Sequence, residues 1–325
     1  MELLIGFDVG GTNLKSGLFD EQLNLLAKDN RPNPRDLSAD SMVEHIVRCG
    51  KELLLNQGFS QKDLKAAGIG CPGAIDMKNG IVRAAPNLPF RNTPMRDMVA
   101  ERMNCPCILE NDANAAAWGE FTAGAAKEVC DMVFFTLGTG IGGGVVCDGK
   151  LIRGFSGEAG ELGHIIIYPD GDRLCGCGQK GCAEAYASAN NTADIANEQL
   201  ARGAESSLLQ IFKKNGGVSC KDVFDHAKKG DRLATDVVDG AAKVLGLLCV
   251  NILHVTQPQR IVFAGGMIAA GDFLLEKIRA QFDKYVWTMK KESLDICFAA
   301  LGEDAGIYGA AALALLQYNK AIRTK

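Results

Sequence analysis

The chain lacks the features that mark several large classes of protein. Its opening residues, Met1 to Asp8, have no basic start and no apolar run long enough for a secretory signal. No stretch approaches the roughly 20 apolar residues that a membrane-spanning helix needs. The formal net charge is only −4, and low-complexity segments and long linkers are missing. We therefore expect a cytoplasmic protein that binds no membrane and, without a broad basic surface, no nucleic acid.

Cysteine, in contrast, is abundant: the 325 residues include 12 cysteines, which we expect to be reduced in a cytoplasmic setting. Three of them follow a histidine closely enough for one tetrahedral Zn²⁺ to bind all four side chains, namely His164, Cys175, Cys177 and Cys182. A Cys₃His set is a closed, structural type of zinc site. Glu161 and Glu184 bracket the cluster, so the metal would position these two carboxylates. The alternative is a metal-free surface loop with three thiols and a hydrogen-bonded histidine.

Strand and helix patterns alternate along the chain. Residues 3–19 alternate around a Gly10-Gly11-Thr12 turn, and residues 133–152 repeat that design around Gly138-Thr139-Gly140, so both predict hairpins. Further patterns predict a strand at 260–264 and helices at 38–58 (capped by Ser38), 93–103 (capped by Thr93), after Asp112, at 233–255 and at 304–318. Mixed strands and helices indicate an α/β protein, and the length suggests two lobes.

The two glycine turns are candidate phosphate sites. Bare backbone N–H groups at Gly10-Gly11-Thr12 and at Gly138-Thr139-Gly140 can hold phosphate oxygens, and Asp8 at the strand end can hold Mg²⁺. Each turn alone could equally be a plain hairpin connection. Gly138-x-Gly140-x-x-Gly143 matches the dinucleotide fingerprint only by letter, because strand rather than helix follows it. A Walker P-loop is absent.

A polar cluster, Glu110-Asn111-Asp112-Ala113-Asn114, stands between a strand at 107–109 and an alanine-rich helix. Side chains at such strand ends often carry the chemistry of α/β proteins. Asp112 can act as a general base toward a hydroxyl that Asn111 orients. The alternative is that Asp112 or Asn114 merely caps the helix, although a helix N-terminus also favours an ionised carboxylate.

Together these motifs resemble the ROK family (repressors, open reading frames and sugar kinases) over nearly the whole chain. The resemblance rests on Asp8-x-Gly10-Gly11-Thr12, Cys71-Pro72-Gly73, Pro86-Asn87-Leu88, Glu110-Asn111-Asp112-Ala113-Asn114, the glycine run 138–144, Glu161-x-Gly163-His164, the cysteine cluster and Ala264-Gly265-Gly266. The last motif has Ala-Gly-Gly-Met where many members have three glycines.

The resemblance implies an actin-like (ribonuclease H-like) two-lobed α/β fold. The smaller lobe would comprise residues 1–110, completed by a C-terminal helix at about 304–320. The larger lobe would comprise residues 111–303, with the zinc loop at 164–182. A cleft between the lobes would close on the substrates and exclude water. Family members also lead us to expect a homodimer or homotetramer.

The activity implied is ATP-dependent phosphorylation of the 6-hydroxyl of a hexose, with most likeness to the glucokinases of the family. Asp112 matches the catalytic base, and Asp8 the position near Mg²⁺. The positions that match sugar contacts are Gly73, Asn87, Asn111, Asp112, Glu161, His164 and Glu184. The nucleotide side would comprise Asp8, Gly10, Gly11, Thr12, Lys15, Thr139, Gly140, Gly265 and Gly266.

Other activities remain open within the same resemblance. N-acetylmannosamine and N-acetylglucosamine kinases share the zinc cluster and both glutamates, and fructokinases are also relatives. Polyphosphate could replace ATP as donor. A sugar-responsive repressor is a further alternative, but repressors of the family carry a DNA-binding domain ahead of the first glycine loop, and here that loop begins at Asp8.

Overall fold

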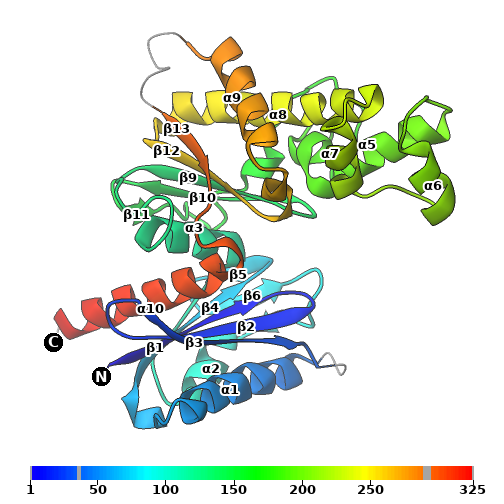
Figure 1. The fold of residues 1–325 in the computed structure, drawn as a ribbon. Helices are drawn as coiled ribbons and strands as arrows, with labels where there is room; N and C mark the ends of the chain where they lie inside the picture. Colours follow the sequence, from blue (N-terminus) through cyan, green and yellow to red (C-terminus); the bar gives the residue numbers. More distant parts are fainter. Residues whose placement is uncertain (1, 35–37, 288–293, 324–325) are drawn as a thin grey trace. The chain divides into compact units, whose positions relative to one another are not determined.

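The computed structural model describes residues 2–34, 38–287 and 294–323. The chain divides into two compact units (Figure 1). The first unit comprises residues 1–128, 144–160 and 300–325, and the second comprises residues 129–143 and 161–299. Each unit has its own helices, and most strands of each of the two larger sheets belong to one unit. The lobe limits that the resemblance implies, 1–110 and 111–303, stay a prediction.

The strands are β1 (Leu3–Val9), β2 (Asn13–Phe19), β3 (Leu25–Pro32), β4 (Leu64–Cys71), β5 (Ala74–Asp76), β6 (Ile81–Ala84), β7 (Arg91–Thr93), β8 (Cys107–Asn111), β9 (Met132–Leu137), β10 (Ile141–Cys147), β11 (Lys150–Leu151), β12 (Arg260–Ala264) and β13 (Asp295–Phe298). The α-helices are α1 (Ala39–Asn56), α2 (Met95–Met103), α3 (Asp112–Thr122), α4 (Glu184–Ala187), α5 (Ala189–Ala201), α6 (Leu209–Asn215), α7 (Cys220–Ala227), α8 (Arg232–Thr256), α9 (Asp272–Tyr285) and α10 (Ala305–Arg323). Short 3₁₀ helices are η1 (Gln61–Asp63), η2 (Leu162–His164), η3 (Gly266–Ala270) and η5 (Gly302–Asp304).

The first unit is built on a five-stranded sheet with the order β3-β2-β1-β4-β8. Strands β1 and β2 form the predicted antiparallel hairpin, and β4 pairs in parallel with both β1 and β8. Helices α1 and α2 cover one face of this sheet and α10 covers the other (Figure 1). Apolar residues on alternate positions of β1, including Ile5 and Phe7, are fully buried. A small antiparallel sheet, β5-β6-β7, completes the unit.

Helix α10 lies directly on the sheet and on α3. A Cβ at Gly68 of β4 would lie 1.8 Å from the carbonyl oxygen of Ala310, and a Cβ at Gly309 would lie 1.6 Å from that of Ala115. Only glycine leaves room for backbones to approach this closely. The C-terminal helix is therefore fixed both to the sheet and to the helix that begins at Asp112.

Two predicted helix starts have different outcomes. Ser38 caps α1 as predicted, with its hydroxyl accepting from the N–H of Ser41 at 3.1 Å. Thr93 does not cap α2, which begins at Met95 with Pro94 in the cap position. Thr93 is instead the last residue of β7, paired with Val82, and its hydroxyl accepts from the N–H of Arg91. Strand pairing has therefore displaced the capping role that its position suggests.

The second sheet has the order β11-β10-β9-β12-β13, with β12 parallel to both β9 and β13. Strand β10 runs from the second unit into the first. The predicted strand at 260–264 is confirmed. Helix α8 packs against α4, α5, α7 and α9 and forms the centre of the helical part of the second unit.

Helix α8 extends the predicted helix at 233–255 by one residue at each end, and it is apolar over a length that the sequence analysis did not expect. Among the described residues it is a candidate membrane span by length and composition, although 67% of its most apolar window is buried inside the protein. It also carries Asp236, Asp239 and Lys243. A buried core helix meets the same criteria.

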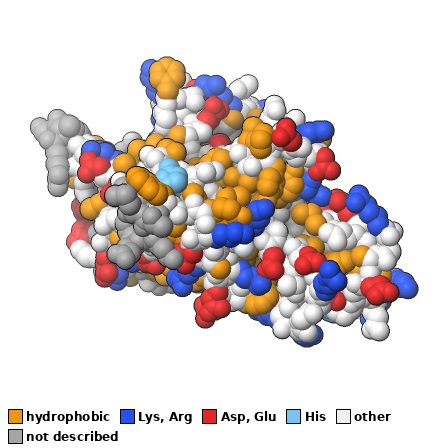
Figure 2. Space-filling view, turned by 90° about the horizontal axis from the view of Figure 1, so that it is seen from above, with side chains coloured by type: hydrophobic (Ala, Val, Ile, Leu, Met, Phe, Trp, Pro, Cys, Tyr) orange, Lys and Arg blue, Asp and Glu red, His pale blue; other side chains and the backbone are white. Residues whose placement is uncertain are grey.

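Some apolar side chains are exposed on the surface. Figure 2 shows hydrophobic side chains gathered near the middle of one face, with charged side chains mainly around them. Val255 and Trp287 of the second unit are 80% and 56% exposed. Clusters of this kind are typical of protein-binding surfaces, and the expected homo-oligomer stays a prediction. All twelve cysteines are free thiols.

Candidate active site and metal centre

In the first unit, the candidate residues stand where three neighbouring parallel strands end. Asp8 on β1 is in register with Gly70 on β4, and Gly70 is in register with Glu110 on β8. Asn111 ends β8 and Asp112 begins α3. Carboxyl ends of adjacent parallel strands meet at one edge of a sheet. The fold therefore brings Asp8 and Asp112 to one edge, although they are far apart in sequence.

The electrostatics of Asp8 reflect that proximity. Burial, followed by the negative charge of Asp112, raises the pKa of Asp8 to about 6, while Lys15 opposes the shift. Burial also raises the pKa of the Cys71 thiol, with further contributions from Asp112 and Asp8. A buried carboxylate whose ionisation a neighbouring carboxylate disfavours is a position that a cation would stabilise.

The first turn of α3 is capped by Asn111. Its Oδ1 accepts from the N–H groups of Ala113 at 3.0 Å and Asn114 at 3.1 Å. Capping by Asp112 or Asn114, the alternative raised from the sequence, therefore does not describe this helix. Asp112 is the first helical residue, half-buried, and its Oδ1 accepts from the N–H of Ala113 at 2.9 Å. The helix N-terminus favours its ionised form.

The glycine loop beside Asp8 is held by hydrogen bonds to Asn33. The side-chain amide of Asn33 donates to the carbonyl of Gly10 at 2.8 Å, and its backbone N–H donates to that of Thr12 at 2.8 Å. Asn87, a predicted sugar contact, packs next to this loop, because a Cβ at Gly11 would lie 3.2 Å from the Asn87 Cβ.

Two further predicted residues of the first unit have clear structural settings. Lys15 donates to the backbone carbonyl and to the carboxylate of Glu303, at 3.2 and 3.1 Å. It is thus tied to the segment before α10. Gly73 has a φ of +104°, and a Cβ there would lie 2.2 Å from the carbonyl oxygen of Ala84. Only glycine suits that position.

Sequence reasoning missed an ion pair behind Asp112. Glu110, 1% exposed, accepts from the Arg153 Nε at 2.8 Å, the Asn111 N–H at 3.0 Å and the Asn114 amide at 3.2 Å. Arg153 follows Glu110 by 43 positions, so no local pattern reports the pair. The pair fixes the strand end from which α3 departs.

In the second unit, the two loops predicted to bind the nucleotide leave the ends of adjacent parallel strands. Ala264 of β12 is in register with Thr136 of β9, and the loops begin just beyond them. The N–H of Gly138 donates to the carbonyl of Gly140 at 3.0 Å, which closes the turn around Thr139. Gly265 has a φ of +90° and lies against Leu137. The structure thus places the 138–140 and 265–266 loops side by side.

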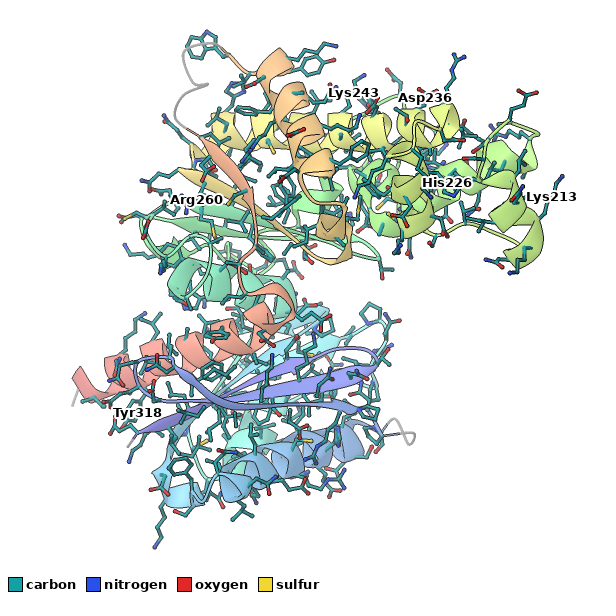
Figure 3. The ribbon with its side chains drawn as sticks, viewed as in Figure 1. Lys213, His226, Asp236, Lys243, Arg260 and Tyr318 are labelled. Atoms are coloured by element: carbon teal, nitrogen blue, oxygen red, sulfur yellow. The ribbon has the colours of Figure 1, made fainter. Side chains whose placement is uncertain are left out.

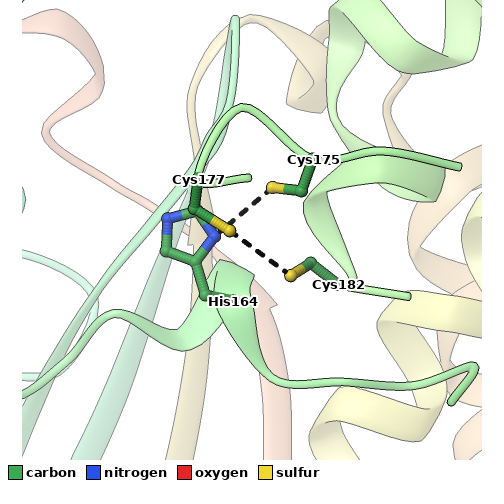
Figure 4. Close-up of side chains that lie close together, drawn as sticks. All are labelled: His164, Cys175, Cys177 and Cys182. Atoms are coloured by element: carbon green, nitrogen blue, oxygen red, sulfur yellow. Dashed lines mark hydrogen bonds between the residues drawn. The ribbon is translucent and has the colours of Figure 1, made fainter. Parts of the chain in front are cut away.

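The predicted metal ligands converge in the second unit (Figure 4). One ligand atom from each of His164, Cys175, Cys177 and Cys182 lies within 4.8 Å of the others. The Cys177 and Cys182 sulfurs are 3.7 Å apart, and the Cys175 sulfur is 3.5 Å from the His164 Nδ1. Tetrahedral Zn²⁺ with ordinary bond lengths requires about 3.8 Å between sulfurs and about 3.6 Å between sulfur and nitrogen. The four side chains therefore fit a zinc ion.

The two bracketing glutamates have different environments. The His164 Nδ1 faces the cysteines, and its Nε2 is 3.9 Å from the Glu161 carboxylate, which is 62% exposed. Glu184 accepts from the N–H of Ile141 at 2.9 Å, and the Cys175 sulfur lies 3.2 Å from its other oxygen. Burial, with this contact adding to it, raises the pKa of Cys175 to about 12 without a metal.

One triad-like group in the second unit is structural. The Ser207 hydroxyl is 2.6 Å from the His226 Nδ1, and Asp231 is close by. The Asp231 carboxylate contacts Ser206 and Ser207 and caps α8 through the N–H of Ala234. It does not orient the histidine as a catalytic triad requires. Figure 3 labels His226 on α7, away from the candidate loops of this unit.

The chain is similar to known proteins over nearly its whole length. The model of the ROK family matches residues 4–317. The chain belongs to the ROK family. It is 36% identical to a glucokinase from Halalkalibacterium halodurans over 97% of this chain and 96% of that protein. An N-acetylmannosamine kinase from Salmonella typhi is 31% identical over 95% of this chain and 97% of that protein.

Solved structures agree with this assignment. A ROK hexokinase from Thermus thermophilus has a TM-score of 0.85 and 31% identity, covering 98% of this chain and 99% of that one. A ROK glucokinase from Streptomyces griseus, in complex with glucose and AMPPNP, has a TM-score of 0.78 and 34% identity, covering 96% and 99%. The expected sugar-kinase fold is thereby confirmed.

Proposed function

We propose that this ROK-family chain is a glucokinase, which transfers the γ-phosphoryl group of ATP to the 6-hydroxyl of glucose. Relatives named glucokinase, matched end to end, support the reaction class. The observation that carries the assignment is the pair of carboxylates, Asp8 and Asp112, at one edge of the first sheet beside the glycine loop.

Asp112 acts as the base. Its carboxylate accepts the proton of the 6-hydroxyl as the hydroxyl oxygen attacks the γ-phosphorus, and the bond to the β–γ bridging oxygen breaks. The partial positive charge at the N-terminus of α3 suits a carboxylate at this position. Asn111 and Asn87, which belong to the same unit as Asp112, orient the sugar.

The phosphates are held by backbone N–H groups of the Gly10–Thr12 loop and by the Thr139–Gly140 loop. Lys15 lies two residues into β2, where its charge faces Asp8. Asp8 would hold Mg²⁺, which supplies positive charge to the phosphate oxygens. The raised pKa of Asp8 fits a position that a cation normally shares.

The zinc cluster supports the sugar-binding side chains. Zn²⁺ held by His164, Cys175, Cys177 and Cys182 would tie the loop together as a structural ion. With Nδ1 directed to the cysteines, the His164 Nε2 carries the proton and donates to a sugar hydroxyl. Glu161 and Glu184 accept from neighbouring hydroxyls.

The test is a coupled assay over a panel of hexoses, with ATP and polyphosphate as alternative donors. We expect the highest kcat/KM for glucose with ATP, and N-acetylmannosamine as the second sugar. The reason is that a site built to hydrogen-bond each hydroxyl rejects sugars that leave its own groups unpaired.

If N-acetylmannosamine or fructose exceeds glucose by about tenfold or more in kcat/KM, the glucokinase label is wrong while the kinase mechanism stands. If no sugar is phosphorylated by either donor, the kinase mechanism itself fails.

A further inference from the structure

The first unit contains a cavity that the proposed reaction does not use. Its volume is about 370 Å³, and it lies at β8, the end strand in the order of the first sheet. Its walls come from the β5–β6 turn, the start of α2, β8, the segment after β11 and the last turns of α10. The lining residues are Met77, Lys78, Arg96, Ile108, Leu109, Arg153, Leu313, Leu316, Gln317 and Lys320.

The cavity combines positive charge with aliphatic walls. Lys78, Arg96, Arg153 and Lys320 line it, whereas Asp97 and Glu110, which are bonded to the two arginines, do not. Its volume falls in the range of about 300–1,000 Å³ that is usual for small-molecule sites. An aliphatic pocket with a few convergent polar groups is the usual composition of such sites.

Arg96 is held in place before any ligand arrives. Its Nε donates to Asp97 at 2.8 Å, its Nη1 donates to the carbonyl of Lys78 at 3.2 Å, and its N–H donates to that of Gly80. The guanidinium also packs on Gly80, where a Cβ would lie 2.6 Å from its Nε. A pre-ordered guanidinium loses little entropy on binding an anion.

Arg153 links the cavity to the catalytic strand end. Its Nε is bonded to Glu110, which also accepts from Asn111 and Asn114. An anion in the cavity would compete with Glu110 for this guanidinium. Glu110 is 1% exposed, and weakening the bond between a buried carboxylate and its partner cation is costly. Occupancy would therefore be transmitted to Asn111 and the start of α3.

We propose that this cavity binds a small phosphate monoester and that its occupancy slows the kinase. Four basic side chains suit a phosphate dianion better than a single carboxylate, even with both arginines also bonded to Asp97 and Glu110, and the fork of Arg is well matched to phosphate oxygens. The aliphatic walls receive the carbon chain of the ester. The effect on rate rests on the proposed kinase function, whereas the binding does not.

The binding test is calorimetric titration of the full chain with glycerol 3-phosphate and with inorganic phosphate, and with glycerate as a carboxylate control. Glucose and a non-hydrolysable ATP analogue are present throughout, so that the phosphate loops are filled. We expect glycerol 3-phosphate to bind with a Kd below about 1 mM, inorganic phosphate more weakly, and glycerate least. Stronger binding by glycerate would overturn the choice of a phosphate ester.

The variant K78Q/K320Q removes two exposed cations of the cavity and leaves its backbone unchanged. We expect this variant to bind glycerol 3-phosphate with an affinity about tenfold or more below that of the wild type. The matched control K62Q/K150Q removes two exposed lysines of the same unit that do not line the cavity, and it should bind like the wild type. Equal binding by both variants, or no binding by the wild type, would overturn the site.

The rate test follows kinase activity at saturating glucose and ATP. Glycerol 3-phosphate should lower kcat of the wild type and of K62Q/K150Q, and should leave kcat of K78Q/K320Q unchanged. Binding without any change in kcat would overturn the coupling through Arg153. Because calorimetry requires no turnover, an inactive chain that still binds the ester would contradict the kinase proposal and not the site.

Discussion

At the scale of single residues, the proposed chemistry depends most on Asp112. We predict that Asp112→Asn lowers kcat by roughly 10²–10⁴, because the amide cannot accept the hydroxyl proton. Stability should change little, since Asn111 rather than Asp112 supplies the helix cap. The measurement is steady-state kinetics beside thermal unfolding. A variant with near-normal kcat would remove Asp112 from the role of base.

The pKa of Asp8 predicts how the stability of the protein depends on pH. Its folded pKa of about 6 lies above the ordinary 3.8, so the ionised form is the one that folding disfavours. This group therefore destabilises the metal-free protein above pH 6, and the penalty disappears as the pH falls through 6 toward 3.8. Asp8→Asn should be more stable than the wild type at pH 7, with the difference shrinking by about 2 kcal/mol by pH 4.

The comparison is made by denaturant unfolding of both proteins at several pH values, without magnesium. Subtracting one curve from the other removes the titration of other groups. A stability difference that does not vary between pH 4 and pH 7 would show that Asp8 titrates normally and is not buried against Asp112.

At the scale of single elements, the proposed zinc site concerns the loop from His164 to Cys182. We predict about one Zn²⁺ per chain, and we expect Cys177→Ala to lose it and to raise KM for glucose. The reason is that Glu184 and His164 lie at the two ends of this loop. Cys130→Ala is the matched control, because Cys130 is an exposed thiol of the same unit outside the cluster.

Elemental analysis of the purified proteins gives the metal content, and the hexose assay gives KM. Wild-type protein that is free of metal and fully active would contradict the role given to the cluster.

The crossing of α3 and α10 gives a prediction about packing. Gly309→Ala should lower the thermal midpoint and kcat together, because the new Cβ meets the Ala115 carbonyl of the helix that begins at Asp112. Such overpacking costs about 1–3 kcal/mol. Gly240→Ala is the control: Gly240 is an exposed helical glycine with open space around it, and alanine there should add up to about 1 kcal/mol. If both substitutions stabilise the protein, the close crossing is not as described.

At the scale of the whole molecule, the sequence predicted what is encoded locally. The β1–β2 hairpin, the Ser38 cap and the convergence of His164 with three cysteines each depend on residues within a short window. Family resemblance supplied the fold class. These features can be read because alternation, capping and ligand spacing are properties of neighbouring residues.

Contacts between residues that are far apart in the chain could not be predicted from local sequence patterns. The Arg153–Glu110 pair joins segments 43 residues apart, and the buried carboxylate of Glu120 accepts the N–H of Leu301 across 181 residues. The same applies to Thr93, whose pairing with Val82 in a small sheet overrides its suitability as a cap. Tertiary context decides such positions, and a single sequence does not display it.

The contact between Glu184 and Gly140 has a practical consequence for enzyme engineering. The Glu184 carboxylate accepts the N–H of Ile141, and a Cβ at Gly140 would lie 2.2 Å from its oxygen. If Glu184 contacts the sugar as proposed, a substitution there that admits another sugar also removes a hydrogen bond that supports the Thr139–Gly140 loop, the proposed phosphate contact. We therefore expect selection for a new sugar at this position to return variants with altered ATP affinity, so screens should vary both substrates from the start.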